Sequence, residues 1–393
     1  MKILFFVALP NPFPGAGWTR VGHFAQTAKK RGHNVKIVGS FLSYRLNKPC
    51  IVDWKGIRIY NICPVFGLDS MLTYIVDFVV SMFMLIPILL WRPDVTVIST
   101  PPCSPSLGTW LGAKITGSRI VIDYRDAFIS YKISTTNSQL DTKALKVYRR
   151  FMSILYQKSD LVVTVTTGTQ KILRNLGVNS TVIPNGADTE TFRPIDRKNR
   201  VFTMIFVCGA IDYYDMTPTL LAVSLLDDLD IKIVIVGDFS SIPRIPWINK
   251  VKRTAQKFGL EDSLVFTGPI TDHNKLAEKI SMANIGIIPV EEGHICSETS
   301  YPVKLFEYCA CGIPSIVIGQ DSSLMGKLVN VHRIGIVVPY GDVIGLTKAI
   351  RKLYENDGYR VMLGKNGRQM VEQRFDRIRS SNRLIQLVES IMK

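Results

Sequence analysis

The stretch TSYPVKLFEYCACGIP, residues 299–314, predicts a short helix that organises the second half of the chain. Ser300 can cap its amino end, because a serine side chain accepts a hydrogen bond from a first-turn N–H. Pro302 suits the first turn, where its missing N–H would have had no partner. Gly312 and Pro314 are typical of a helix end. We therefore expect a helix of about two turns between Ser300 and Gly312.

Two charged residues of this helix predict a binding site for an anion. Lys304 and Glu307 are three residues apart, so both side chains project from one side near the amino end. There, free N–H groups and the helix dipole favour negative charge. A cation beside phosphate oxygens and a carboxylate that accepts from vicinal hydroxyls would suit a sugar nucleotide. The alternative on spacing alone is an ordinary buried helix whose two charges form a surface pair.

Composition indicates a folded protein with an anionic partner. The 393 residues are 47% hydrophobic and 20% charged, enough for two domains that each have a core. A net charge of +16 favours phosphorylated small molecules, nucleic acid or an acidic membrane. The chain has no zinc-finger or RNA-binding motif, so we expect no nucleic-acid partner. Its seven cysteines form no CxxC pair, which fits a reduced cytoplasmic compartment.

The apolar tract Ile75–Trp91 predicts a helix that is buried or lies at a membrane surface. Asp77 and Pro87 interrupt it, and it is short for a bilayer span. At the amino terminus, the apolar run Lys2–Leu9 predicts a strand covered on both faces rather than a signal sequence. Peripheral contact with an anionic membrane is therefore the expectation.

The first part of the chain predicts a βαβ unit with a ligand-binding loop. Lys2–Leu9 is followed by a Pro- and Gly-rich loop, a helix at Thr19–Arg31 and a strand at Asn34–Gly39. Gly15, Ala16 and Gly17 would let the backbone approach a ligand closely. The run GAGWTRVG lacks the third glycine of a dinucleotide fingerprint, which argues against an oxidoreductase.

Arg125 and Asp126 stand at a second candidate site. They follow the predicted strand Arg119–Asp123, and ligands of open α/β sheets bind beyond the carboxyl ends of strands. The alternative is an ion pair within their own loop. The polar segment Ser130–Asp141 predicts a mobile loop, followed by a helix at Thr142–Lys158.

Alternating strands and helices occur twice, which predicts two doubly wound Rossmann-like domains facing across a cleft. We expect a first domain at 1–195, a second at 196–375, and a carboxyl-terminal helix at 376–393 that packs back on the first. The strands predicted after the boundary are Thr203–Val207, Lys232–Val236, Leu264–Thr267, Ile285–Pro289, Ser315–Ile318 and Gly335–Val338.

With these stretches located, nearly the whole chain resembles the retaining glycosyltransferases of family 4, which have the GT-B fold. The resemblance is carried by DYRDAF, VIPNGAD, VGD, FTGPI and above all PVKLFEYCACGIP. It implies a hexosyltransferase with a nucleotide-diphosphate sugar as donor. We expect no metal or other cofactor, because no strand-end loop has a DxD motif and the five histidines have no ligand spacing. Members with a DxRD motif are often enzymes of surface polysaccharide or glycolipid assembly, so the resemblance implies a glycan or lipid-linked acceptor.

The resemblance also assigns roles to residues. Glu307 matches the glutamate that holds the donor's ribose hydroxyls, and Lys304 matches a residue that touches the diphosphate. Gly15–Gly17 matches the loop near the transferred sugar. The remaining positions implied at the donor site are Gly209, Gly237, Gly268, Pro269, Ser300, Tyr301, Pro302 and Val303.

Two departures from the family leave roles open. Thr299 stands where a glutamate is common near the reacting sugar, with Glu298 one step away. GAIDYYDM lacks the usual basic pair, so Arg20 or Arg125 would assist Lys304 at the diphosphate. DYRDAF offers Arg125 and Asp126 where the family histidine is expected, and we take Asp126 as the first catalytic carboxylate and Glu298 as the second.

Three functions follow from these observations. The first is transfer of a sugar to a hydroxyl acceptor with retention of configuration. The phosphates then need fixed positive groups, because charge develops on them as the bond breaks. The second is a sugar-nucleotide epimerase of the same fold, and the third is a non-catalytic sugar-binding protein, which Thr299 keeps open.

Overall fold

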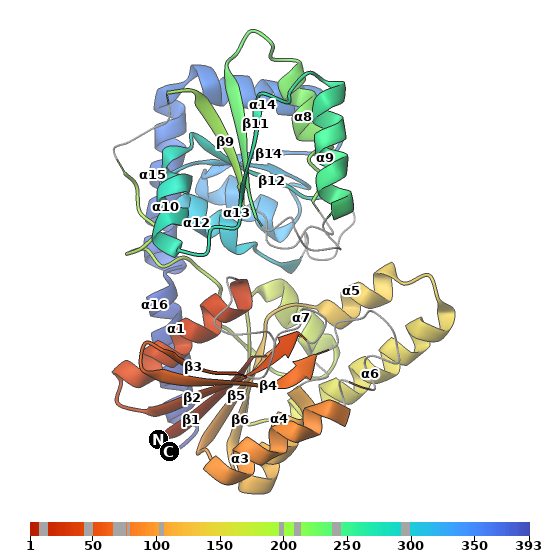
Figure 1. The fold of residues 1–393 in the computed structure, drawn as a ribbon, viewed down its shortest axis with the longest axis vertical. Coiled ribbons are helices and arrows are strands. Elements are labelled where there is room, and N and C mark those ends of the chain that lie inside the picture. Colours follow the sequence, from red (N-terminus) through yellow and green to blue (C-terminus); the bar gives the residue numbers. More distant parts are fainter. Residues whose placement is uncertain are drawn as a thin grey trace. The chain divides into compact units, whose positions relative to one another are not determined.

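The chain folds into two compact units in the computed structural model (Figure 1). The first unit is Met1–Asn185 with Ile378–Lys393, and the second is Gly186–Arg377. The residues that the structure describes are 1–7, 15–42, 50–65, 76, 79–101, 106–195, 200–207, 214–237, 245–291 and 299–393.

The first unit has an eight-stranded sheet with the order β3-β4-β2-β1-β5-β6-β7-β8. Only the pairing of β3 with β4 is antiparallel among the described strands. Every residue of β1 after the first is buried, as a continuous apolar run predicts for a central parallel strand. The strands are β1 Lys2–Val7, β2 Asn34–Leu42, β3 Cys50–Trp54, β4 Ile57–Val65, β5 Val95–Thr100, β6 Arg119–Tyr124, β7 Leu161–Thr164 and β8 Thr181–Val182.

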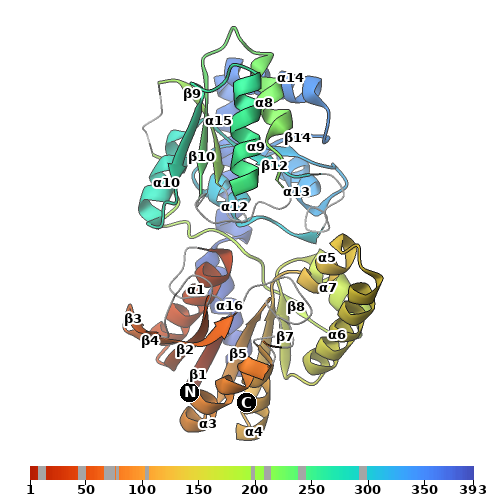
Figure 2. The same ribbon diagram turned by 45° about the vertical axis from the view of Figure 1, so that its right-hand side comes forward.

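Helices cover both faces of this sheet (Figures 1 and 2). Side chains of α1 and α16 share one core with the sheet, and those of η2, α3, α4, α5 and α6 share the other. The helices are α1 Ala16–Lys30, η2 Ser81–Met84, α3 Leu85–Trp91, α4 Ser106–Thr116, α5 Phe128–Thr135, α6 Gln139–Gln157, α7 Thr167–Asn175 and α16 Arg377–Ser390.

The segment expected to be a mobile loop, Ser130–Asp141, is largely helical. The helix α5 extends to Thr135, and α6 begins at Gln139. Ser138 caps α6 by accepting a hydrogen bond from Asp141 N at 3.2 Å. The loop prediction is wrong because polar residues here form helix ends and exposed helix faces.

The second unit has a parallel sheet with the order β11-β10-β9-β12-β13-β14. This is a doubly wound order whose direction reverses between β9 and β12. The strands are β9 Phe202–Val207, β10 Ile231–Val236, β11 Leu264–Gly268, β12 Ile285–Pro289, β13 Ser315–Ile318 and β14 Gly335–Val338. The helices are α8 Thr217–Ser224, α9 Ile245–Lys257, α10 His273–Met282, α12 Val303–Ala310, α13 Leu324–His332, α14 Val343–Glu355 and α15 Asp357–Arg374.

The division between the units falls at 185/186 rather than at 195/196, because the intervening residues pack in the second unit. Ala187 and Phe192 are fully buried in its core. Arg368 on α15 donates to the Phe192 carbonyl at 2.7 Å and to the Thr189 carbonyl at 3.1 Å. These contacts tie the segment after Asn185 to the second sheet.

The carboxyl-terminal helix α16 packs in the first unit. Leu384, Ile385 and Val388 are fully buried in the core that α1 shares. At its end, Glu389 accepts from Arg31 Nη2 at 2.6 Å and lies 2.9 Å from His33 Nε2. The helix α16 therefore completes one of the two cores of the first unit.

Candidate active site

The helix α12 begins later than the sequence predicts. It spans Val303–Ala310, and Pro302 precedes it in an extended conformation with ψ 136°. No side chain caps its amino end, and the Ser300 hydroxyl has no hydrogen-bond partner among the described residues. The expectation that Ser300 caps the helix and that Pro302 lies in its first turn is wrong. Within the described part of the chain, the N-cap residue thus offers no side chain to the first-turn N–H groups.

Gly312 ends the helix as expected. It has φ +71° and donates its N–H to the Cys309 carbonyl at 2.9 Å. Ile313 N donates to the Tyr308 carbonyl at 3.1 Å, which completes a Schellman motif. This ending turns the chain directly into β13.

Lys304 is buried against two aromatic rings. Its Nζ lies 4.3 Å from the centre of the Phe206 ring and 3.9 Å from that of Tyr214, and the residue is 7% exposed. Phe206 is on β9, and Tyr214 forms a bridge with Val290, which follows β12. Lys304 therefore lies where the strand order reverses, the usual ligand position in such sheets. The two ring faces hold the ammonium by cation–π attraction.

Glu307 is also buried, at 8% exposed, so the surface-pair alternative for Lys304 and Glu307 is excluded. Burial raises the pKa of the Glu307 carboxyl, while the charges of Arg377 and Lys304 lower it. No described residue donates a hydrogen bond to this carboxyl, although buried carboxylates usually have donors. Hydroxyl groups of a ligand could supply them.

Tyr308 fixes α12 on the sheet. Its hydroxyl accepts a hydrogen bond from Val207 N, at the end of β9, at 2.8 Å. Its ring packs against Gly286 of β12, where a β-carbon would overlap the ring. Sequence reasoning missed this residue, although a glycine inside an otherwise apolar strand signals close packing. Lys304 and Glu307 thus project from a helix anchored on both strands of the reversal.

The remaining donor-site positions of the second unit lie at strand ends or before α12. Gly237 follows β10 and donates to the Gly268 carbonyl at 3.1 Å. Gly268, the last residue of β11, has φ +72°, and Pro269 follows it. The Tyr301 ring lies 5.9 Å from that of Phe306, which positions the segment ahead of the helix. Gly209 and Glu298 lie outside the described residues.

In the first unit, the structure brings Gly17 and Arg125 together. Gly15 precedes α1, which begins at Ala16, and a β-carbon at Gly17 would overlap the Arg125 guanidinium. Arg125 is buried, follows β6 and donates to the Pro101 carbonyl after β5. Gly15–Gly17 and Arg125 therefore lie at the carboxyl edge of this sheet. Arg125 therefore contacts Pro101 and Gly17, which both lie outside its own loop, and its interactions are not limited to an ion pair within that loop.

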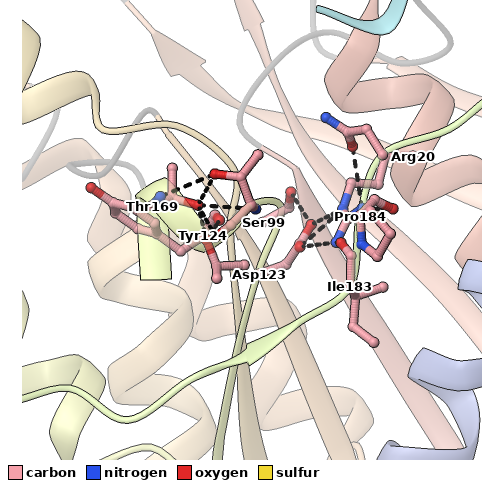
Figure 3. Close-up of polar contacts among 10 residues, drawn as sticks. Arg20, Ser99, Asp123, Tyr124, Thr169, Ile183 and Pro184 are labelled. Carbon is pink, nitrogen blue, oxygen red and sulfur yellow. Dashed lines mark hydrogen bonds and ion pairs between the residues drawn. The ribbon is translucent and has the colours of Figure 1, made fainter. Parts of the chain in front are cut away.

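Asp126, next to Arg125, has a perturbed carboxyl group. Burial raises its pKa, Arg125 and Arg20 lower it, and Asp123 raises it. A carboxyl that is partly withdrawn from water near cations is typical of functional sites. The end of β6 is fixed close by, because Thr164 Oγ1 donates to the Tyr124 carbonyl at 2.9 Å and lies 2.7 Å from Thr169 Oγ1 (Figure 3).

Arg20 is fully engaged within the first unit, so the expectation that it contacts a diphosphate is wrong. It forms a buried ion pair with Asp123 at 2.9 Å, and Asp123 also accepts from Ser99 Oγ at 3.0 Å (Figure 3). Its other donors bind the carbonyls of Ile183 at 2.9 Å and Pro184 at 3.1 Å. Nη1 also donates to Asn185 Oδ1 at 3.2 Å, and Nε donates to Asp123. Every N–H group of Arg20 therefore has an acceptor. Arg20 therefore holds the strand end that leads out of this unit.

Two protein-family models match the chain in succession. One, described as a glycosyl transferase 4-like domain, matches residues 15–186, and the other, described as glycosyl transferases group 1, matches residues 188–370. Together they take in most of the sequence, and their junction coincides with the division of the structure. No curated protein sequence matches the chain.

Solved structures share its fold over the full length. Sucrose-phosphate synthase from Thermosynechococcus elongatus matches with a TM-score of 0.79 at 16% identity, covering 100% of this chain and 99% of that one. HepE from Anabaena, solved in complex with UDP-glucose, matches at 0.74 and 13% identity, with 99% and 100% covered. WaaG, a glycosyltransferase involved in lipopolysaccharide biosynthesis, matches at 0.71 and 15% identity, with 98% and 99% covered.

At these identities the structural likeness concerns the fold, whereas the family models identify the domains. The chain belongs to the glycosyltransferases that join a 4-like domain to a group 1 domain, and it has their GT-B fold of two Rossmann-like domains.

Proposed function

We propose that this glycosyltransferase moves a hexosyl group from a nucleotide-diphosphate sugar to a hydroxyl acceptor with retention of anomeric configuration. The carrying observation is the buried pair Lys304 and Glu307 on α12, at the reversal of the second sheet. The bond between the sugar's anomeric carbon and the diphosphate breaks, and its electrons stay on the phosphate oxygen. A new bond forms to the acceptor oxygen, whose proton is released.

In this proposal Lys304 and Glu307 bind different parts of the donor, the diphosphate and the ribose respectively. The Lys304 ammonium, held on two ring faces, stabilises the charge that develops on the departing diphosphate. The uncapped start of α12 adds backbone N–H groups for the same charge. The Glu307 carboxylate accepts hydrogen bonds from the ribose hydroxyls, which supplies the donors that described residues do not. Gly237, Gly268, Pro269 and the segment 300–303 border this donor.

On the first unit, we assign the acceptor-side chemistry to Asp126, with Arg125 beside it. A carboxylate there can orient the acceptor hydroxyl or stabilise positive charge on the sugar ring. Arg125 is held against Gly17 and fixes the loop that would border the transferred sugar. Glu298 is the second candidate for the carboxylate. In this scheme the chain's own cations balance the phosphate charge, and no metal or other cofactor takes part.

We place the reaction in polysaccharide, glycolipid or glycoprotein glycan assembly, in the cytoplasm or on the cytoplasmic face of the membrane. The DxRD motif and the net charge of +16 support this setting. The relatives that share the fold include an enzyme of lipopolysaccharide biosynthesis and one solved with UDP-glucose. A UDP-hexose is therefore the first donor to try.

A thermal-shift panel of UDP, GDP, ADP and CMP compounds tests donor binding, because a ligand that binds the native state raises the unfolding midpoint. We expect one base to stand out, and its sugar conjugate to stabilise further. Product analysis then separates the alternatives. A new sugar nucleotide formed without acceptor would identify an epimerase, and binding without turnover would indicate a sugar-binding protein. An inverted anomeric centre in the product would contradict retention.

A further inference from the structure

The exposed large apolar side chains of the first unit gather on one side. They lie on or directly before the helices η2, α3, α4 and α6, which with α5 form what we call the outer helical layer. Figure 1 shows this layer on the side of the sheet opposite α1 and α16. Elsewhere in the described part of this unit, only Ile51 and Met392 are large, apolar and exposed. The ten residues of the layer are Val79, Phe83, Ile86, Leu89, Leu90, Ile115, Leu140, Val147, Phe151 and Ile154.

The helix α6 is apolar on two sides. One side packs in the core through Leu145, Met152, Leu155 and Tyr156. The other carries Leu140, Val147, Phe151 and Ile154, whose spacing of seven, four and three residues forms a straight stripe along the helix. Leu140 is 81% exposed and Val147 71% exposed. Phe151 and Ile154 are each 39% exposed, so the stripe is most open to solvent at Leu140 and Val147.

The segment of η2 and α3 repeats this arrangement. Met84 and Ile88 are fully buried, whereas Phe83, Ile86 and Leu90 point outward, with Leu90 82% exposed. Their spacing of three and four residues again gives a stripe. Exposed apolar side chains that are grouped along a helix in this way indicate an interaction surface rather than scattered exposure.

The charged residues of the outer helical layer indicate which kind of partner this surface binds. Its helices contain one acidic residue, Asp141, and six basic residues: Lys114, Lys132, Lys143, Lys146, Arg149 and Arg150. Lys143, Lys146 and Arg150 are exposed and follow the α6 stripe. Apolar side chains beside lysines and arginines suit the boundary of a bilayer with acidic headgroups. Two copies of this surface would instead bring like charges together.

We propose that the outer helical layer is the surface by which this protein docks on an anionic membrane. Phe83, Ile86, Leu90, Val147 and Phe151 enter the headgroup boundary, and the basic side chains bind the headgroups. This is surface docking: no helix among the described residues is long and apolar enough to span a membrane. The inference rests on the proposed function for its purpose, which is to bring the first unit to an acceptor carried on a lipid.

Vesicle flotation of the full chain tests the proposal, with phosphatidylcholine vesicles and with vesicles that also contain phosphatidylglycerol. We expect flotation with the acidic vesicles and release as salt rises, because the screening length shortens. A charge variant, Lys143→Glu with Lys146→Glu and Arg150→Glu, should bind at least about a hundredfold more weakly, because loss of each basic residue alone costs roughly fivefold and the new carboxylates add repulsion. An apolar variant, Phe83→Ser with Leu90→Ser and Val147→Ser, should also lose binding.

Matched controls come from the second unit. Lys275→Glu with Lys327→Glu and Lys348→Glu changes net charge equally at exposed lysines. Val331→Ser with Ile344→Ser removes apolar side chains that are 76% and 59% exposed. Both controls should float like the unchanged protein. Because all substituted side chains are exposed, the unfolding midpoints should be unchanged, which separates lost docking from lost folding.

Two outcomes overturn the proposal. The first is a flotation result: the unchanged protein shows no salt-sensitive flotation, or the charge and apolar variants of the layer float as well as the controls. The other is a dimer in light scattering that the apolar variant dissociates, which would make the layer an interface between copies. Donor binding in the thermal-shift panel is measured separately. If it persists while flotation fails, the docking inference fails and the transferase proposal stands; the reverse result contradicts only the transferase.

Discussion

The Nζ of Lys304 lies 3.9 Å from the centre of the Tyr214 ring, although the two residues come from segments far apart in the chain. Tyr214 follows β9 and Lys304 lies in the first turn of α12, so the contact joins the two sides of the strand-order reversal. A desolvated contact of this kind is worth about 2 kcal/mol, enough to fix the ammonium in one place. The position of this cation is therefore set before any ligand arrives.

Replacing Lys304 with alanine should lower turnover by roughly tenfold to a hundredfold. The loss corresponds to charge-assisted hydrogen bonds of about 1.5–3 kcal/mol to the departing diphosphate. Steady-state kinetics with the donor found in the thermal-shift panel measure it. Lys348→Ala, at an exposed position of the same unit, is the control. Turnover close to normal in Lys304→Ala would remove this residue from the mechanism.

The substitution Glu307→Gln keeps the size of the side chain and should weaken donor binding by roughly tenfold to a hundredfold. Burial raises the carboxyl's pKa above its ordinary 4.5, so donor affinity of the unchanged protein should rise with pH as the carboxylate forms. The variant should lack this rise. Calorimetric titration of the donor at several pH values checks both expectations. An unchanged affinity would count against the ribose role.

The same raised pKa has a consequence for stability. The native state holds the Glu307 proton more tightly than the unfolded chain does, so the free energy of unfolding contributed by this group falls as pH rises from its ordinary pKa through the raised one. Glu307→Gln should flatten this part of the profile. Urea denaturation at a series of pH values in that window measures the difference.

Asp126→Asn should reduce kcat by about a hundredfold or more while donor binding is retained, because the proposed donor contacts are on the other unit. Burial raises the pKa of this carboxyl above 3.8, and the rate of the unchanged protein should fall as pH drops through the raised value. Asp262→Asn, an exposed carboxyl of the second unit, controls for charge. A variant as fast as the unchanged protein would shift the role to another carboxylate.

Arg20→Met should destabilise the first unit by about 3–5 kcal/mol, since it leaves the Asp123 charge buried without its partner. The exposed pair of Arg351 and Asp228 provides the contrast, and Arg351→Met should cost about 1 kcal/mol or less.

Tryptophan fluorescence during urea unfolding can follow the first unit, because Trp247 is the chain's one tryptophan outside it. A Trp247→Phe background isolates that signal for Arg20→Met. For Arg351→Met, which lies in the second unit, the difference between the chain with Trp247 and the Trp247→Phe background reports the unfolding. If both arginine variants lost the same free energy of unfolding, the buried pair of Arg20 and Asp123 would contribute no more than an exposed ion pair.

The strands could be predicted from the sequence because parallel strands buried on both faces read as continuous apolar runs. Ser315–Ile318 and Gly335–Val338 are correct to the residue. Polar segments are harder to predict: the expected loop at Ser130–Asp141 is largely helical, because Ser and Thr at helix ends resemble loop composition. The Ser300 cap failed because the chain is still extended at Pro302.

Positions at the site were predictable wherever a residue directly follows a strand, as Arg125 and Asp126 do after β6. Partners from distant segments were not. The rings of Phe206 and Tyr214 around Lys304, and the carbonyls of Ile183 and Pro184 around Arg20, are brought together only by the packing of whole elements. Local spacing contains no signal for such contacts.

The burial of Leu384, Ile385 and Val388 against the amino-terminal sheet sets an order for biosynthesis. The second unit is one uninterrupted segment and can fold as soon as it leaves the ribosome. The first unit lacks part of its core until the final helix has been translated. A premature stop shortly before residue 378 would therefore damage the half of the protein that was synthesised first.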